Sequence, residues 1–277
     1  MAYDYKHLRI SNDGRVSTVT VDNPPINLIT WELFAELSEL CRELAADTDI
    51  SVVVMRSADP AFFLAHFDVA ALLEIPIDQP ARERSELGPF HEMCERFRTM
   101  DKVTIAQIEG RVGGGGSELA ASFDMRFGVR GATIINQMEV PLGILPGGSG
   151  TQMLPRLVGR ARAMEIVLGG DDIDAETAER WGYLNRVFAA TEIGPWVSRF
   201  ARQIAACPPE TIRLAKASVD ASNQPLKEGQ LTEAFLFERL MRLPEARNRM
   251  AWFLANGGQT REGELRLPDV ITGLRKL

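Results

Sequence analysis

Two glutamates stand beside glycine-rich stretches of this 277-residue chain. Glu118 follows four consecutive glycines, Gly113 to Gly116, and Glu139 precedes a second stretch rich in glycine and proline. Two carboxylates around one site can hold a water molecule and exchange protons with it. Burial and mutual repulsion raise at least one pKa of such a pair towards neutrality. Both glutamates are therefore candidates for general acid–base catalysis.

The four glycines lie between a predicted strand, residues 103–108, and a helix that we expect to open at Ser117. Glycine lets a ligand approach the main chain closely, and a helix N-terminus offers unpaired N–H groups. Such a turn suits a phosphate or a developing oxyanion. A Walker A loop would need a lysine after the last glycine, and Gly116-Ser117-Glu118 has none. A purely structural turn capped by Ser117 is the remaining alternative.

Strand-like and helix-like segments alternate through the first half of the chain, which predicts an α/β fold with buried strands. The expected strands are 16–21, 51–55 and 103–108, and the expected helices are 31–44 and 87–100. After about residue 195 only helices are expected, over 195–206, 209–221 and 226–243. We therefore predict a core domain over residues 1–195 and a helical subdomain over residues 196–277.

The composition is that of an ordinary globular protein, with 45% hydrophobic and 25% charged residues. A net charge of -7 opposes nucleic acid as a main partner. No apolar run reaches the roughly 18 residues that span a bilayer, and the first residues lack a signal peptide. We therefore expect a cytoplasmic protein that does not enter membranes. The three cysteines and three histidines show no ligand spacing, so no disulfide or metal site is predicted.

Two motifs resemble those of the enoyl-CoA hydratase/isomerase (crotonase) superfamily. The first is Gly114-Gly115-Gly116-Ser117-Glu118-Leu119 with Asp124, and the second runs from Glu139 through Gly143 and Pro146-Gly147 to Gly150-Thr151-Gln152. The resemblance implies that Gly115 donates its N–H to a thioester oxygen and that Glu118 and Glu139 are the catalytic acid and base. Relatives that isomerise double bonds often keep one of these glutamates, so two favour a hydratase.

The segment Phe63 to Val69 resembles the part of the superfamily that supplies the second donor to the thioester oxygen. Aligning Asp68 with that motif makes Phe67 the donor and puts His66 in place of a glycine. Any residue except proline offers a backbone N–H, although the ring of Phe67 narrows the space beside the thioester. The substrate-binding residues that the resemblance implies are Ile26, Leu28, Ala65, Asp68, Val69 and Gly114.

The resemblance further implies a crotonase (ClpP-like) spiral of ββα units, followed by helices that build a trimer or hexamer. It implies a 2-enoyl-CoA hydratase that needs no cofactor, because CoA is part of its acyl-CoA substrate. Three alternatives stay open: a double-bond isomerase, another crotonase reaction, or an acyl-CoA-binding protein in which Phe67 blocks catalysis. An apolar stripe of Phe235, Leu236, Leu240 and Met241 predicts burial between subunits.

Overall fold

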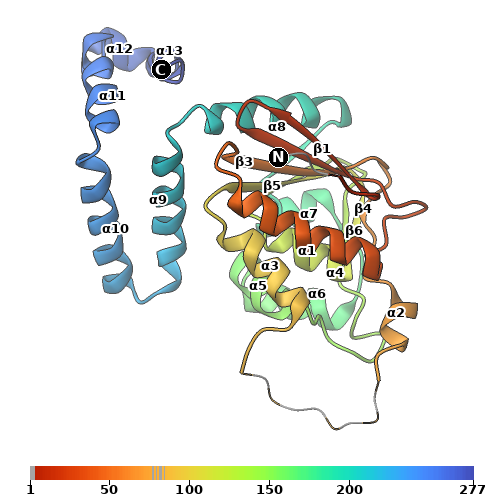
Figure 1. The fold of residues 1–277 in the computed structure, drawn as a ribbon. Helices are drawn as coiled ribbons and strands as arrows, with labels where there is room; N and C mark the ends of the chain where they lie inside the picture. Colours follow the sequence, from red (N-terminus) through yellow and green to blue (C-terminus); the bar gives the residue numbers. More distant parts are fainter. Residues whose placement is uncertain (1–3, 77, 79, 81–82, 84) are drawn as a thin grey trace.

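Two β-sheets form the centre of the molecule (Figure 1), a computed structural model that describes residues 4–76, 78, 80, 83 and 85–277. The larger sheet has the strand order β1-β2-β3-β5-β7-β10, and the smaller has the order β4-β6-β8-β9. Pairing is parallel throughout, except between β1 and β2 and between β8 and β9.

The strands of the two sheets include the three that the sequence predicted. The larger sheet contains β1 (Leu8–Asp13), β2 (Val16–Val21), β3 (Val52–Ser57), β5 (Val103–Ile108), β7 (Met125–Val129) and β10 (Arg186–Phe188). The smaller sheet contains β4 (Phe62–Leu64), β6 (Arg111–Gly113), β8 (Ile134–Asn136) and β9 (Ile173–Asp174). The predicted strands at 16–21 and 103–108 are confirmed, and the one predicted at 51–55 lies one to two residues later.

The chain repeats one structural unit three times. Each unit places a strand in the larger sheet, the next strand in the smaller sheet, and then a helix. The units are β3-β4 with α3 (Pro89–Thr99), β5-β6 with α4 (Gly114–Ala121), and β7-β8 with α5 (Gly150–Val158). This repetition is the predicted spiral of ββα units, and it brings β4, β6 and β8 side by side. Four further helices connect the strands: α1 (Trp31–Ala46), α2 (Val69–Leu73), α6 (Arg160–Gly169) and α7 (Ala175–Trp181).

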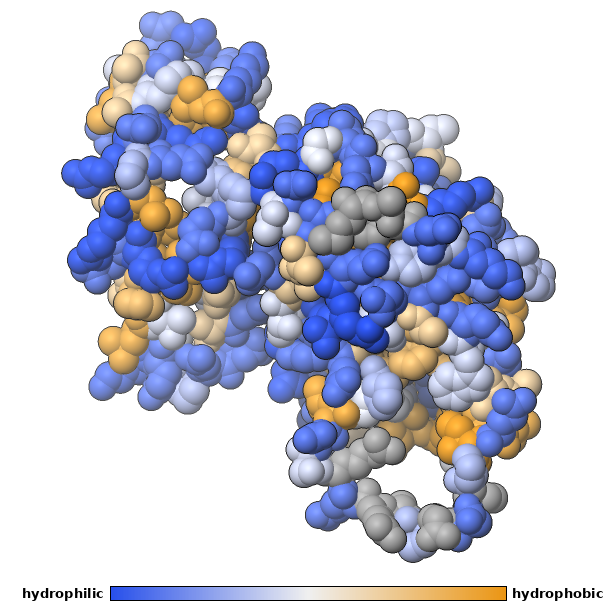
Figure 2. Space-filling view, in the orientation of Figure 1, coloured by the Kyte–Doolittle hydropathy of each residue, from blue (hydrophilic) through white to orange (hydrophobic). Residues whose placement is uncertain are grey.

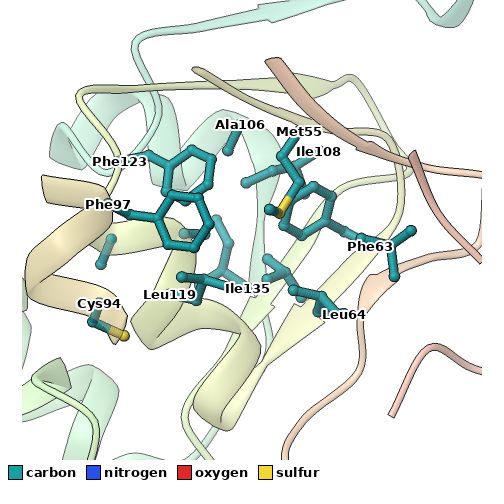
Figure 3. Close-up of a cluster of buried hydrophobic side chains, with 14 of the residues drawn as sticks. Met55, Phe63, Leu64, Cys94, Phe97, Ala106, Ile108, Leu119, Phe123 and Ile135 are labelled. Atoms are coloured by element: carbon teal, nitrogen blue, oxygen red, sulfur yellow. The ribbon is translucent and has the colours of Figure 1, made fainter. Parts of the chain in front are cut away.

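A hydrophobic core fills the space between the two sheets and helices α3 and α4 (Figure 3). Met55 of the larger sheet and Phe63 of the smaller one are fully buried. Phe97 of α3 stacks on Phe123 with ring centroids 5.1 Å apart. Every residue of α4 is buried, including Leu119 at its centre. The core therefore fixes the position of the helix that carries the glycine motif.

Helix α8 (Ala190–Ala205) covers the other face of the larger sheet. Its residues Ile193, Val197 and Ala201 are buried in a second cluster with Val52 and other side chains of the sheet. The helix was expected to begin at Pro195 but begins five residues earlier, because its first turns already pack on the sheet. The predicted domain boundary between residues 195 and 196 thus falls inside α8, a helix that packs against the larger sheet.

The remaining helices extend away from the two sheets (Figure 1). They are α9 (Pro209–Asp220), a short 3-10 helix (Ala221–Asn223), α10 (Leu226–Met241), α11 (Pro244–Ala255), α12 (Arg261–Leu265) and α13 (Leu267–Leu274). The predicted helix starts after Pro208 and Pro225 are confirmed. Within this described part of the chain, α10 buries only Leu236, while Phe235 is 59% exposed. Figure 2 shows apolar side chains spread over this extension.

No helix in the described ranges is both long and apolar enough to cross a lipid bilayer.

One lysine ties this helical extension to the core. Nζ of Lys216 in α9 lies 2.9 Å from Oδ2 of Asp124 and donates to the Lys102 carbonyl at 2.8 Å. The same Asp124 carboxylate accepts from the backbone N–H of Thr104 at 2.8 Å. Asp124 belongs to the first sequence motif, and in the structure it joins the end of α4 to strand β5 and to α9.

Replacing this lysine should destabilise the protein measurably. Lys216→Met removes hydrogen bonds that a largely buried ammonium makes to a carboxylate and a carbonyl, which costs about 1.5–3 kcal/mol. Urea unfolding of the variant should show this loss. Lys227→Met, at an exposed lysine on α10, is the matched control and should change the free energy of unfolding by less than about 0.5 kcal/mol. Equal stability of the two variants would contradict this account of how α9 is anchored.

Candidate active site

Three of the predicted site segments follow the carboxyl ends of three adjacent parallel strands. Phe67 comes shortly after β4, Gly115 directly after β6, and Glu139 shortly after β8. Because β6 pairs with β4 on one side and β8 on the other, Gly115 lies between the other two. The carboxyl edge of a parallel sheet is a common place for ligand sites, and here the topology assembles one from segments far apart in sequence.

Helix α4 begins at Gly114, not at Ser117 as the sequence suggested. Gly114 has a φ of 44°, in the region that favours glycine. A Cβ at Gly116 would lie 2.4 Å from the Leu64 carbonyl oxygen, so only glycine lets the helix approach the end of β4 this closely. Ser117 does not cap the helix, because its hydroxyl bonds the Tyr183 hydroxyl at 2.9 Å in the core.

The backbone N–H groups of Phe67 and Gly115 lie close together and have no hydrogen-bond partner in the described part of the chain. Ile29 pairs with Phe67 as a short parallel bridge in which Ile29 bonds the His66 carbonyl and the Asp68 N–H. Since backbone groups alternate along a strand, the Phe67 N–H points the other way. Gly115 lies in the first turn of α4, where N–H groups have no intrahelical partner. Among the hydrogen bonds of the described residues, neither N–H has an acceptor. A Cβ at Gly115 would lie 3.6 Å from the Phe67 nitrogen.

Glu118 is a buried carboxyl group held by two backbone donors. Its Oε1 accepts from the N–H of Gly148 at 2.6 Å and from that of Gly150 at 2.8 Å. Burial raises the pKa of Glu118 to about 7, the two N–H groups oppose this rise, and the charge of Glu139 adds to it. Glu118 can therefore hold or release a proton near neutral pH.

Glu139 is also buried, and one of its oxygens is unpaired. The residue is 7% exposed, and Oε2 has no hydrogen-bond partner among the described residues. Burial raises the pKa of Glu139, while its own backbone N–H and the nearby His66 lower it. An unpaired buried carboxylate oxygen is costly, which favours the neutral form of Glu139 and agrees with the direction in which burial shifts its pKa.

Both glutamates, together with Phe67 and Gly115, line one cavity of about 580 Å³. Most of its wall is apolar. Its lining residues are Trp31, Phe34, His66, Phe67, Val69, Leu72, Ile75, Gly88, Pro89, Phe90, His91, Gly115, Glu118, Met138, Glu139, Leu142, Ile144, Leu145, Gly147 and Gly148. Among the described residues, no group of three or more His, Cys, Asp or Glu side chains could hold a metal ion. The cavity thus brings together two carboxyl groups and the backbone of Phe67 and Gly115.

The predicted substrate-binding residues divide into two groups. Val69 lines the cavity, and the other five are not part of its wall. Ala65 is buried beneath the site, and Asp68 caps α2 by accepting from the Ala70 N–H at 2.9 Å. Gly114 lies between the side chains of His66 and Glu139. The remaining two, Ile26 and Leu28, lie in the loop before α1 and are partly exposed.

An aromatic cluster beside the site was not found from the sequence. The Phe67 ring packs edge-on against Trp31 at 5.1 Å, Phe90 at 5.8 Å and Phe34 at 6.3 Å between centroids. These partners come from α1 and α3, and their helical spacing is equally typical of core residues. Because the cluster holds the ring of Phe67 to one side, the ring forms part of the wall and leaves the cavity open.

This geometry can be compared with known proteins. A family model described as enoyl-CoA hydratase/isomerase matches residues 11–256. The chain belongs to the enoyl-CoA hydratase/isomerase family. This family member is 29% identical over 216 residues to the short-chain-enoyl-CoA hydratase of Clostridium acetobutylicum. The aligned residues cover 78% of this chain and 81% of the relative. It is 30% identical over 253 residues to a probable enoyl-CoA hydratase of Rhizobium meliloti, covering 91% and 96%.

Solved structures give the same result for the fold of this family member. A Streptomyces avermitilis protein of known crystal structure is 38% identical, with a TM-score of 0.71 over 99% of this chain and all of that one. DspI of Pseudomonas aeruginosa is 28% identical, with a TM-score of 0.81 over 92% and 96% of the two chains. The predicted crotonase fold is therefore confirmed.

The raised pKa of Glu118 predicts how stability depends on pH. Folding favours the neutral form of Glu118. The stability of the wild type that depends on this neutral form is fully present below about pH 4.5 and is lost as the pH rises through about 7. Glu118→Gln stays neutral at every pH. It should therefore match the wild type near pH 4 and be more stable at pH 8 by about 3 kcal/mol. Chemical unfolding of both proteins across this range checks the result, and equal stability at pH 8 would contradict the buried, protonated carboxyl.

Proposed function

We propose that this protein is a 2-enoyl-CoA hydratase that adds water across the double bond of an acyl-CoA thioester. One observation carries the proposal: Glu118, Glu139 and the free N–H groups of Phe67 and Gly115 all border one largely apolar cavity. An isolated carboxylate pair would suit many reactions. Combined with two converging backbone donors, it suits a reaction that develops an enolate oxygen next to a proton transfer.

The reaction assigns a task to each group. The oxygen of water bonds to C3 while one of its protons passes to a glutamate. The electron pair of the C2=C3 bond moves towards the thioester oxygen, where the Phe67 and Gly115 N–H groups stabilise the negative charge. The other glutamate then gives a proton to C2. The pair must therefore carry one proton between the two carboxyls, and the pKa of about 7 for Glu118 supports such a state near neutral pH.

Two further predictions belong to this proposal. The apolar side chains left exposed on the helical extension, such as Leu226, Leu231 and Phe237 at 77%, 62% and 64%, support assembly into a homotrimer or homohexamer. The hydratase needs no cofactor, since the CoA moiety belongs to the substrate. A cytoplasmic location stays a prediction.

The two glutamates should both be needed for hydration. Glu118→Gln and Glu139→Gln are nearly isosteric and should keep the fold and the affinity for CoA esters. Each should lower kcat for 2-enoyl-CoA hydration by about 10²-fold or more, the usual contribution of general acid–base catalysis. Loss of the conjugated thioester absorbance measures the rate, and Glu165→Gln at an exposed position on α6 is the control. Full activity of Glu139→Gln would instead favour an isomerase that relies on Glu118.

Phe67→Ala distinguishes the hydratase from a binding protein. The backbone N–H survives this change, so the rate with short 2-enoyl-CoA esters should stay near that of the wild type. Removing the ring enlarges the cavity, and bulkier acyl groups should gain about 10- to 200-fold in kcat/KM, as expected when an apolar pocket changes size. A wild type that binds acyl-CoA without turnover, together with an active Phe67→Ala variant, would show that the ring blocks catalysis and would reject the proposal.

A further inference from the structure

Gln137 is a fully buried glutamine to which the mechanism above assigns no role. It follows directly after β8 and is 0% exposed. The parallel register of β6 and β8 pairs Gly113 with Asn136. The next residues along the two strands, Gly114 and Gln137, are therefore neighbours, and Nε2 of Gln137 lies 3.2 Å from the Gly114 carbonyl oxygen. A carbonyl oxygen only accepts, so the amide nitrogen is the donor.

This hydrogen bond acts on the peptide unit that contains the Gly115 N–H. The Gly114 carbonyl and the Gly115 N–H belong to one planar unit. Over the described residues the only cis peptide bond is Pro24-Pro25, so this unit is trans and its N–H points away from its carbonyl. Gln137 thus holds the unit from the side opposite to the N–H. Gly115 lines the cavity, and Gln137 is not part of its wall.

The peptide unit of the other proposed oxyanion donor is held in the same way. The His66 carbonyl shares a unit with the Phe67 N–H and accepts from the N–H of the buried Ile29 at 2.9 Å. A peptide unit whose carbonyl accepts a hydrogen bond is polarised, which makes its N–H a stronger donor. For Phe67 this support comes from backbone. For Gly115 it comes from a side chain, which can be replaced.

Stability alone does not account for a glutamine at this position. Its Oε1 is buried and has no hydrogen-bond partner in the part of the chain that the structure describes. An unpaired buried acceptor costs at least as much as one hydrogen bond contributes, so it offsets the gain from the bond at Nε2. An apolar side chain of the same length should therefore leave the protein about as stable.

We propose that Gln137 is a positioning residue that orients and polarises the Gly115 donor of the oxyanion hole through the Gly114–Gly115 peptide. This inference rests on the proposed function, in which the thioester oxygen accepts from that N–H. Negative charge on this oxygen is then stabilised by two hydrogen bonds in series, one from Gly115 to the oxygen and one from Gln137 to the Gly114 carbonyl. Gln137 gives up no proton, so its removal should slow every step that forms the enolate.

Two variants remove this bond in different ways. Gln137→Met keeps the length of the side chain without a donor, and Gln137→Asn keeps an amide that is one methylene too short to reach the Gly114 carbonyl. Each should lower kcat for 2-enoyl-CoA hydration about 10-fold with little change in KM, less than the roughly 10²–10³-fold effect of removing an oxyanion donor itself. Gln107→Met is the matched control, because Gln107 is a buried glutamine of β5 that bonds Glu109 and lies outside the cavity wall. It should hydrate at the wild-type rate.

The carbonyl stretch of a bound saturated acyl-CoA, isotopically labelled at the thioester carbonyl, measures the polarisation directly. Infrared difference spectra of the wild type should place this stretch below its frequency in solution. Both Gln137 variants should shift it part of the way back. They should also slow deuterium exchange at C2 of the same ligand by about the factor found for hydration, because both reactions place negative charge on the thioester oxygen. Gln107→Met should do neither.

The inference is overturned if a folded Gln137 variant hydrates and polarises the thioester like the wild type. It is also overturned if a variant loses activity while the bound thioester keeps the wild-type stretch, because Gln137 would then only support the fold. Since Met and Asn differ in size and polarity, one variant that folds is enough for this test. A wild type that polarises the thioester and exchanges C2 protons but never hydrates 2-enoyl-CoA would reject the hydratase function alone. The shifted stretch in the variants would still support the role of Gln137.

Discussion

The rest of the site depends on one constraint: the first residues of α4 must be glycines, which have no side chain. Gly116 lets the helix approach the end of β4, where even a methyl group would lie 2.4 Å from the Leu64 carbonyl oxygen. Gly114, two residues before it, leaves the space that His66 and Glu139 enter from two other strand ends. Without this contact Gly115 would not lie beside the backbone nitrogen of Phe67. The two proposed oxyanion donors and the second carboxylate therefore all depend on how closely one helix packs against one sheet edge.

The same close packing explains the electrostatics of the site. Helix α4 is buried along its whole length, so Glu118 extends from it into an environment that disfavours a charge. Two backbone N–H groups offset part of this penalty, and the remaining effect is a pKa of about 7. Glu139 reaches the cavity from a neighbouring strand and meets His66 there. The fold thus gives two chemically identical side chains different surroundings, which is what a division between acid and base requires.

The sequence predicted most of the fold and the centre of the site but missed the wall of the cavity. Strands β2 and β5 were predicted to the residue, because their apolar runs are bounded by clear turn residues. The start of α4 was missed because glycine has poor helix propensity, and here tertiary packing overrides it. Trp31, Phe34 and Phe90 could not be placed, because amphipathic helices show which face is apolar but not which residues reach a cavity. Ile26 and Leu28 match a motif whose place in the fold lies outside the described cavity wall.

A crystal structure of the protein with a saturated acyl-CoA thioester would test the central claim most directly. The account predicts that the thioester oxygen lies about 2.7–3.1 Å from the backbone nitrogens of both Phe67 and Gly115, the range of an oxyanion hole. It also predicts that C2 and C3 face Glu118 and Glu139. A thioester bound elsewhere, or an oxygen that contacts only one of the two nitrogens while a protein group occupies the other, would contradict it.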